Sequence, residues 1–423
     1  MHSKPSDKTF KSYLFFWLGQ LFSLLGSSII GFAITWWIAD TTGSAIYLSI
    51  AAFSSSLPMV ILTPFMGVFI DRWNRKITIG LTDFLQAFTT FWIIIMFLLN
   101  IENIWLLIVL NMVRAIFQAI HYPTVNAIIP IMIPKKHLSR MNGINYFFTG
   151  MIRTIGPVIA ATLLLFLVIE QILWIDIVTF IIAIIPLLLI TIPPIQKNSV
   201  QANKEPFLKE MKFGIKILKA VPGLLTLLIL ISIINLLNNP FNTLMPLFIK
   251  INHSGGAFEF AIVSALIQVG VVIGALISSL KKEWKHKEMI ILQSIIIGII
   301  GYLITTIAPH GNFLLIGIGG LIHASMMPIA NTMFLTIIQT RVPTETQGRV
   351  FSIVVSIAFS VMPIGMILSG PLAELFGIYI LFISSLILQT IILILTWLFS
   401  DIRHIKNENV SIENKDNKDP REF

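Results

Sequence analysis

Long apolar stretches, separated by short polar breaks, recur along almost the whole chain. A helix that rises about 1.5 Å per residue needs about 20 largely apolar residues to cross the hydrocarbon core of a bilayer. Stretches of that length occur twelve times, so the pattern predicts an all-α membrane protein with twelve transmembrane helices. The predicted spans are residues 13–39, 45–70, 77–99, 104–125, 141–169, 172–192, 224–249, 260–280, 289–307, 313–338, 350–373 and 378–400.

A polar segment in the middle of the chain, residues 193–221, separates the first six predicted spans from the last six. Within this linker, apolar residues recur at helical spacing from Phe207 to Leu218, which favours an amphipathic helix along the membrane surface. The predicted organisation is a cytoplasmic N-terminus at 1–12, six-helix bundles at 13–192 and 222–400, and a disordered cytoplasmic tail at 401–423.

Short patterns from the first half return in the second half at a nearly constant offset. Gly67 returns as Gly274, Pro123 and Asn126 return as Pro328 and Asn331, and the spacing from Pro134 to Arg140 returns from Pro343 to Arg349. Six predicted spans separate the members of each pair, so both members have the same sidedness. The sequence therefore predicts two parallel six-helix repeats around a shared site, as in transporters that rock between two states.

Composition and charge agree with a membrane protein and add an orientation. Hydrophobic residues make up 56% of the chain and charged residues 12%, which excludes a soluble core. The net charge of +9 does not indicate a nucleic-acid partner, because nearly all of the 29 Lys and Arg lie on one predicted side. Only Lys250 falls in an outside loop, and only Arg114 and Arg153 fall within spans. The positive-inside rule therefore predicts that both termini are cytoplasmic.

Two carboxylates, Asp83 and Asp176, and the two arginines fall inside predicted spans, where a charge is costly unless it faces an interior partner or water. Burial raises the pKa of a carboxyl and a nearby guanidinium lowers it, so an Asp and an Arg in one cavity can exchange a proton. Both carboxylates are candidate proton carriers, and we expect Arg114 to be the counter-charge. A static ion pair or a backbone hydrogen bond is the alternative for each Asp, and proton transfer is the favoured interpretation for Asp83 but not for Asp176. Arg153 either pairs with a carboxylate or attracts an anionic substrate.

The seventh predicted span carries Asn235, Asn238, Asn239 and Asn242 at helical spacing beside Pro240. Such amides can hydrogen-bond a bulky substrate while Phe241 and apolar neighbours bury it, which predicts a substrate site in the central cavity. Interhelical hydrogen bonding explains the same stripe equally well. His323 is a further candidate contact, although a neutral histidine with one structural partner is the commoner case.

The loop after the second span runs from Gly67 to Lys76 and combines a close-packing glycine, Asp71 and Arg72 at the membrane edge, and Arg75 in a basic cluster. This loop resembles the signature loop of the major facilitator superfamily, with Asn74 where a glycine is usual. The resemblance implies that the loop holds the cytoplasmic helix ends together in one conformational state. A loop whose basic residues only fix the orientation is the alternative interpretation.

Further motifs extend the resemblance over residues 12 to 400. Arg114 resembles the fourth-helix arginine that the superfamily links to proton movement, although a structural arginine explains it as well. Gly156-Pro157, followed by Ala160-Ala161, resembles the antiporter motif of the fifth helix, with alanines where glycines are usual; a plain proline bend is the alternative. The early Gly19-Gln20 and the segment from Arg341 to Gly365 are similar to the macrolide-efflux branch. Gln20 is therefore a candidate substrate contact.

The resemblance implies a bacterial cell-membrane exporter of amphipathic drugs or macrolides, working by proton antiport and alternating access. Its expected partners are a small-molecule substrate, protons and the lipid bilayer, with the protein acting as a monomer without cofactor or metal. An exporter of a lipid, a siderophore or another organic anion is the alternative transport function. A scaffold or an intramembrane enzyme is the alternative class. The chain has no Gly-Lys dipeptide, which excludes a phosphate-binding loop, and the sequence offers no convincing catalytic set, so we expect no enzyme.

Overall fold

A computed structural model describes residues 6–70, 73–193, 218, 221, 223–280, 284–342 and 344–399, and within these residues the protein is helical. Twelve of the described helices are long and apolar enough to cross a membrane, which confirms the predicted fold class. The elements are α1 Asp7–Thr42, α2 Ala45–Ile70, α3 Arg75–Leu98, α4 Ile104–Met132, α5 Lys135–Leu164, α6 Ile169–Leu189, α8 Leu224–Leu247, the π-helix η1 Phe248–Asn252, α9 Ala257–Leu280, α10 Lys287–Thr306, α11 Phe313–Arg341, α12 Thr344–Phe376 and α13 Ile378–Phe399.

Several helices extend beyond their predicted apolar stretches because local signals define their ends. The Ser6 side chain accepts a hydrogen bond from the Thr9 amide, so α1 begins in the polar N-terminal segment. Asn74 and Asn103 cap the first turns of α3 and α4 in the same way. α4 continues through Pro123 and reaches Met132, several residues past the predicted boundary.

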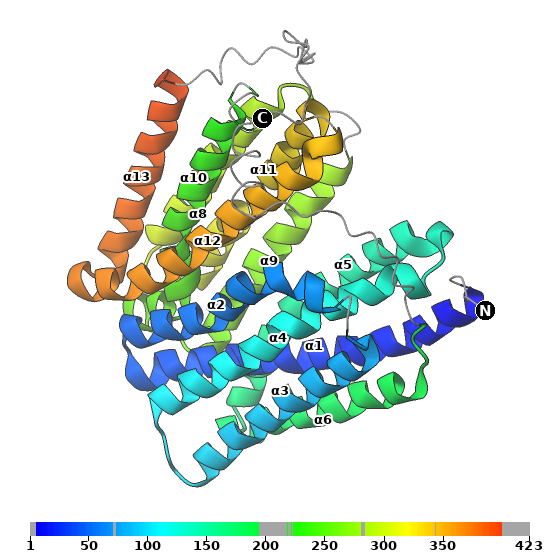
Figure 1. Cartoon of the computed structure of the whole chain (residues 1–423). Helices are drawn as coiled ribbons and strands as arrows, with labels where there is room; N and C mark the ends of the chain where they lie inside the picture. The colour runs from blue at the N-terminus through cyan, green and yellow to red at the C-terminus, as the bar shows by residue number, and fades with distance from the viewer. Residues whose placement is uncertain are drawn as a thin grey trace, which may run out of the picture.

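Helices α1–α6 pack into one bundle and α8–α13 into a second bundle (Figure 1). We call the end of the molecule at which α1 begins the near face, and the end at which α1 finishes the far face. The near ends of the two bundles point away from each other, whereas their far ends meet. Across the junction α2 packs against α12, and α5 packs against α9. The arrangement is two six-helix halves that are joined toward the far face.

Small residues allow neighbouring helices to approach closely in both halves. A Cβ atom at Gly156 in α5 would lie 2.7 Å from the Cβ of Ser28 in α1. A Cβ atom at Gly274 in α9 would lie 1.9 Å from the Ser325 carbonyl oxygen in α11. The repeated prolines, Pro123 and Pro328, lie in the fourth helix of each half, α4 and α11. The sequence repeat therefore corresponds to equivalent helices of the two halves.

Some predicted features lie outside the described residues. They include most of the linker, with its predicted amphipathic helix, and the C-terminal tail. Asp71 and Arg72 of the signature loop also lie outside, so their predicted role stays a prediction.

Candidate functional site

A central cavity of about 520 Å³ lies between the two halves. Helices α1, α2, α3 and α4 supply most of its wall, and Asn242, Thr243 and Met366 come from α8 and α12 of the second half. Among the lining residues Arg114 is the charged one, and the other polar groups are hydroxyls and amides beside aliphatic side chains. The polar lining residues are Ser27, Thr35, Ser55, Ser56, Gln86, Asn111, Arg114, Gln118, Asn242 and Thr243.

A second cavity of about 180 Å³ lies inside the first half, and we call it the N-half cavity. Helices α1, α3, α4, α5 and α6 form its wall. Asp83, Asp176, His121 and Arg153 all line it. Ser27, Gln86 and Gln118 line both cavities, so the two are neighbours that share one wall.

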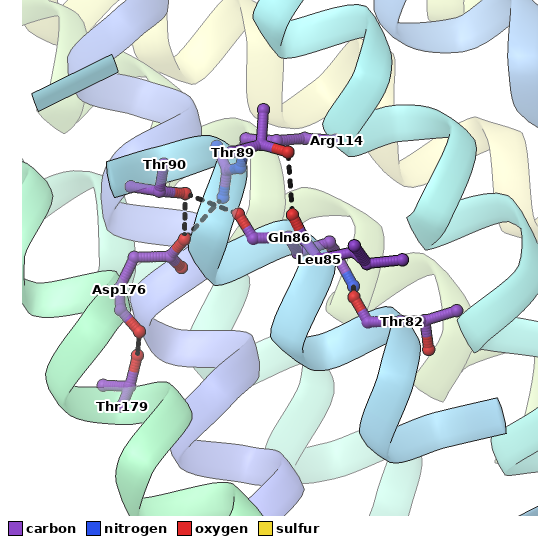
Figure 2. A network of polar contacts seen from close by, with 8 residues as sticks. All are labelled: Thr82, Leu85, Gln86, Thr89, Thr90, Arg114, Asp176 and Thr179. Carbon is purple, nitrogen blue, oxygen red and sulfur yellow. Dashed lines mark hydrogen bonds and ion pairs between the residues drawn. The ribbon is translucent and has the colours of Figure 1, made fainter. Parts of the chain in front are cut away.

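Arg114 and Asp176 form a buried ion pair across that wall (Figure 2). Arg114 Nη2 lies 3.0 Å from Asp176 Oδ2, and Thr90 Oγ1 donates a hydrogen bond of 2.5 Å to the same carboxylate oxygen. Arg114 lines the central cavity and Asp176 lines the N-half cavity. The Arg114 Nε atom is buried without a hydrogen-bond partner among the described residues, so one donor of this guanidinium is unused.

Asp83 belongs to a different pair, formed with α1 and α4. His121 Nε2 lies 3.0 Å from Asp83 Oδ1, and Gln20 Nε2 donates a hydrogen bond of 3.3 Å to Asp83 Oδ2. Of the two candidate carboxylates, Arg114 thus pairs with Asp176 and not with Asp83. Arg114 and His121 lie two turns apart on one face of α4, so they meet carboxylates at two different levels of the bundle.

Some of the predicted substrate residues line one of the two cavities, and others contact neighbouring residues within the helices. Asn242 lines the central cavity, and Gln20 and Arg153 line the N-half cavity. Asn235 accepts a hydrogen bond from Asn239 through its backbone carbonyl, inside α8. Asn238 lies on the same helix with its Oδ1 atom buried and without a hydrogen-bond partner among the described residues.

Phe241 and His323 line neither the central cavity nor the N-half cavity, so their contact with substrate stays a prediction. Phe241 is 1% exposed and packs against Tyr302, His323 and Phe382. The His323 Nδ1 atom lies 2.8 Å from the Gly298 carbonyl oxygen. Both side chains are part of the packing of the second half, because Pro240 and the flanking apolar residues turn this face of α8 toward α10, α11 and α13.

The signature loop contacts the near ends of the first half. Arg75 Nη1 donates a hydrogen bond of 3.1 Å to the Ala127 carbonyl in α4. Lys76 Nζ donates hydrogen bonds of 2.8 and 2.7 Å to the carbonyls of Leu188 and Ile190 at the end of α6. Gly67 lies in the last turn of α2, and Gly156 and Pro157 lie in α5 at its crossing with α1. The Arg75 and Lys76 contacts tie the start of α3 to the near ends of α4 and α6.

Polar contacts join the two halves at the far face. Lys250 Nζ lies 2.8 Å from Asp40 Oδ1, which joins η1 to α1. Glu374 in α12 accepts hydrogen bonds from the Ser44 hydroxyl and, at 3.3 Å, from the Ile46 amide. Phe260 of α9 stacks on Phe32 of α1. The sequence interpretation placed Lys250 outside but assigned it no partner.

Several residues of the two cavities were missed from the sequence, and His121 is the most important. Its signal was present, because Arg114, Gln118 and His121 follow one another at the spacing of one helix face. Thr90 and Gln86 repeat the same spacing from Asp83 in α3. Polar residues at helical spacing opposite a charged residue are therefore the pattern that would have found the site.

Comparison with known proteins gives one consistent answer. Residues 16–365 match the sequence profile of the Major Facilitator Superfamily. The chain is 29% identical over 390 residues to macrolide efflux protein A of Streptococcus pyogenes, covering 92% of this chain and 96% of that protein. It is 23% identical over 367 residues to the multidrug efflux pump Tap of Mycolicibacterium fortuitum, covering 85% and 88%.

Solved structures give the same fold. A bacterial homologue of the iron transporter ferroportin, in an inward-facing state, matches with a TM-score of 0.68 at 15% identity, covering 92% of this chain and 98% of that one. The chain therefore belongs to the major facilitator superfamily, in its macrolide-efflux-like branch, and is a transporter and not an enzyme.

Proposed function

We propose that this protein is a secondary active transporter of a bacterial cell membrane that exports amphipathic small molecules, of the drug or macrolide type, in exchange for protons. The central cavity carries the proposal, since helices of both halves border it. Its volume of about 520 Å³ falls within the range of small-molecule sites, and its mixture of hydroxyl, amide and aliphatic groups suits an amphipathic molecule. The names of the relatives support the same direction of transport.

The near face is the cytoplasmic face in this proposal, because the basic residues of the chain gather on that side. The near ends of the halves diverge and the far ends are held by Asp40–Lys250 and by the contacts of Glu374. This supports a state that takes up substrate from the cytoplasm. Export then requires the far-face contacts to break while the near ends close, so the cavity alternates between the two sides.

The Arg114–Asp176 pair is suited to couple substrate to protons. Arg114 lines the central cavity, so a substrate oxygen there can compete with Asp176 for the guanidinium. A buried carboxylate that loses its counter-charge favours the protonated form. The proton then leaves Asp176 when Arg114 returns to it, so substrate and proton occupy the transporter in alternation.

Vesicles that contain the purified protein and an imposed pH gradient test this function. We expect radiolabelled macrolide, and unrelated cationic dyes, to move against their own concentration gradients when protons flow down theirs in the opposite direction. Transport that does not respond to the gradient would contradict proton antiport. The Asp176→Asn variant should lose uphill movement and keep substrate exchange at equal pH, because exchange needs no net proton transfer. Normal pumping by this variant would remove Asp176 from the proton route.

An exporter of an organic anion is a second candidate function, and Arg153 favours it. This arginine lies within the membrane, lines the N-half cavity and has no ion pair among the described residues. Competition experiments separate the two functions. Anionic amphiphiles should inhibit export of labelled substrate, and Arg153→Gln should weaken that inhibition, if an anion is the natural cargo. Stronger inhibition by cationic amphiphiles, unchanged by the variant, supports the first function.

A further inference from the structure

Two facing rows of polar side chains connect the two ion pairs of the first half. Asp83, Gln86 and Thr90 form one row, on α3, and Arg114, Gln118 and His121 form the other, on α4. Asp83 and His121 meet at the end closer to the near face, and Thr90 and Arg114 meet Asp176 at the other end. Gln86 and Gln118 lie between these ends and line both cavities.

The Asp83–His121 contact is buried but incompletely satisfied. The side chains of Asp83 and His121 are 4% and 11% exposed, and Nε2 and Oδ1 are 3.0 Å apart. The buried Nε2 atom makes no well-aligned hydrogen bond with any described residue. An Nε2–H group can donate a hydrogen bond to Asp83 in the neutral tautomer and in the imidazolium, and in the imidazolium both partners are charged. The contact is therefore a place where His121 can hold a proton beside a carboxylate.

The N-half cavity connects this site with Asp176. Both carboxylates and the imidazole line the same cavity of about 180 Å³. A water molecule occupies about 30 Å³ of liquid volume, so the cavity has room for several waters. Its wall also supplies Gln20, Ser23, Ser27 and Thr149, which offer the hydrogen-bond partners that such waters need. Hydrogen-bonded water can carry a proton between groups that do not touch.

We propose that Asp83 and His121 form a second proton-binding site, through which the proton of Asp176 exchanges with the near-face solvent. This inference rests on the proposed proton antiport. The proton leaves the Asp176 carboxyl, passes along water in the N-half cavity and binds His121 Nε2. It then leaves Nε2 for water at the near face, and His121 returns to the neutral form. Asp83 stays ionised throughout and stabilises the imidazolium.

The other titratable and charged groups around the cavity fit a site for a single proton. They are Tyr13 of α1, Tyr122 of α4, Arg153 of α5 and Asp176 of α6, with Arg114 behind Asp176. The two tyrosines are uncharged near neutral pH. Arg153 adds a fixed positive charge that opposes a second cation, while Asp83 favours one imidazolium. The route for protons is thus separate from the central cavity that holds the substrate.

The test uses the full-length protein in vesicles, comparing the wild type with His121→Gln. We measure proton flux with an enclosed pH dye, uphill export of macrolide, and macrolide exchange at equal pH on both sides. A positioned proton-transfer group contributes about 100-fold or more to a rate, so we expect a loss of uphill export of at least about tenfold. Exchange should stay within about twofold of the wild type. The pH profile of export should differ from that of the wild type, because the variant has no proton-binding side chain at this position.

Two further variants keep the inference falsifiable if His121→Gln folds poorly. Added imidazole should restore proton-coupled export to His121→Ala, because the removed side chain leaves space for it. Asp83→Asn should move the pH profile to lower pH, because the imidazolium loses its counter-charge. His286→Asn is the matched control, since His286 lies at the near-face start of α10, away from both cavities. It should behave as the wild type.

The outcomes separate this inference from the proposed function. If wild-type export ignores the pH gradient, the proposed function itself fails. If wild-type export is proton-driven and His121→Gln keeps both its rate and its pH profile, the proposed function stands and the second proton site is wrong. A lack of imidazole rescue, together with an unshifted Asp83→Asn profile, contradicts the inference in the same way.

Discussion

Gly156 lies where α5 crosses α1, and its missing side chain sets how closely these helices pack. A Cβ atom there would lie 2.3 Å from Ser28 Oγ and 2.7 Å from Ser28 Cβ. Gly156→Ala should therefore destabilise the protein by about 1 to 3 kcal/mol, as overpacking usually does. Thermal unfolding of the detergent-solubilised protein measures this. The pair Gly156→Ala with Ser28→Gly should recover most of the loss, and a double variant as unstable as the single one would contradict the contact.

Phe241 and Asn242 are neighbours in sequence with different surroundings. Phe241 is packed among Tyr302, His323 and Phe382, so Phe241→Ala should cost about 3 kcal/mol of stability with little selective effect on substrate. Asn242 lines the central cavity, so Asn242→Ala should leave stability unchanged and weaken substrate binding by about three- to tenfold, the value of one hydrogen bond. Equilibrium binding and thermal unfolding of both variants measure these effects. Weaker substrate binding by Phe241→Ala without a loss of stability would place Phe241 in the substrate site.

The types of the charged residues within the membrane were predictable, and their pairing was not. Asp83, Asp176 and Arg114 stand out because charges in apolar spans are rare and costly. Which of them meet depends on how α3, α4 and α6 are placed against one another, and close packing at small residues contributes to that placement. A Cβ atom at Gly26 would lie 2.1 Å from Thr179 Oγ1, one turn from Asp176, so even this glycine helps to place α6. Single-sequence hydropathy contains no such information.

At the scale of elements, hydropathy predicted every span and misplaced several ends. The helix signal comes from the apolar run, whereas the ends depend on caps such as Ser6 and Asn74 that lie in polar segments. The five-residue π-helix η1 was also unpredicted. It follows Pro246 and contains Lys250, which forms the ion pair with Asp40. The irregular turn is therefore part of the far-face junction.

The segment after η1 should respond to acid at the far face. Burial lowers the pKa of His253, the neighbouring His310 lowers it further, and a hydrogen bond with the Pro309 carbonyl raises it in part. The folded segment thus favours neutral His253, whose Nδ1 accepts a hydrogen bond of 3.3 Å from the Gly311 amide. Its stability is complete above the ordinary pKa of about 6.5 and falls as the pH drops from there toward the lowered value.

Hydrogen exchange measures this pH dependence directly. After correction for the intrinsic exchange rate, amides of residues 248–254 and 310–313 should lose protection when the pH is lowered from about 7.5 to about 5.5, because imidazole changes charge in that range. His253→Gln keeps an acceptor for the Gly311 amide and does not titrate, so its protection should stay constant over the same range. An equal loss of protection in this variant would assign the effect to another group.

At the scale of the whole molecule, the repeat at a constant offset predicted paired halves, and its prolines lie in α4 and α11, the fourth spanning helix of each half. The conformational state could not be predicted, because in the proposed transport cycle one sequence supports both a near-open and a far-open arrangement. The difference between them lies in contacts such as Asp40–Lys250, Ser44–Glu374 and Phe32–Phe260, which join residues far apart in the chain. The junction thus combines polar contacts with aromatic packing, and the proposed opening has to break both.

Distances between spin labels test the central claim, the alternating opening of a shared cavity, most directly. The chain contains no cysteine, so two cysteines for spin labels can be introduced at a time without removing others. The near-face pair is Lys135→Cys with Gln339→Cys, and the far-face pair is Thr41→Cys with Tyr379→Cys. Adding macrolide under a proton gradient should shorten the near-face distance and lengthen the far-face distance in a share of the molecules, and Lys250→Gln should enlarge that share. Near-face and far-face distances that stay unchanged, or that lengthen together, would contradict the account.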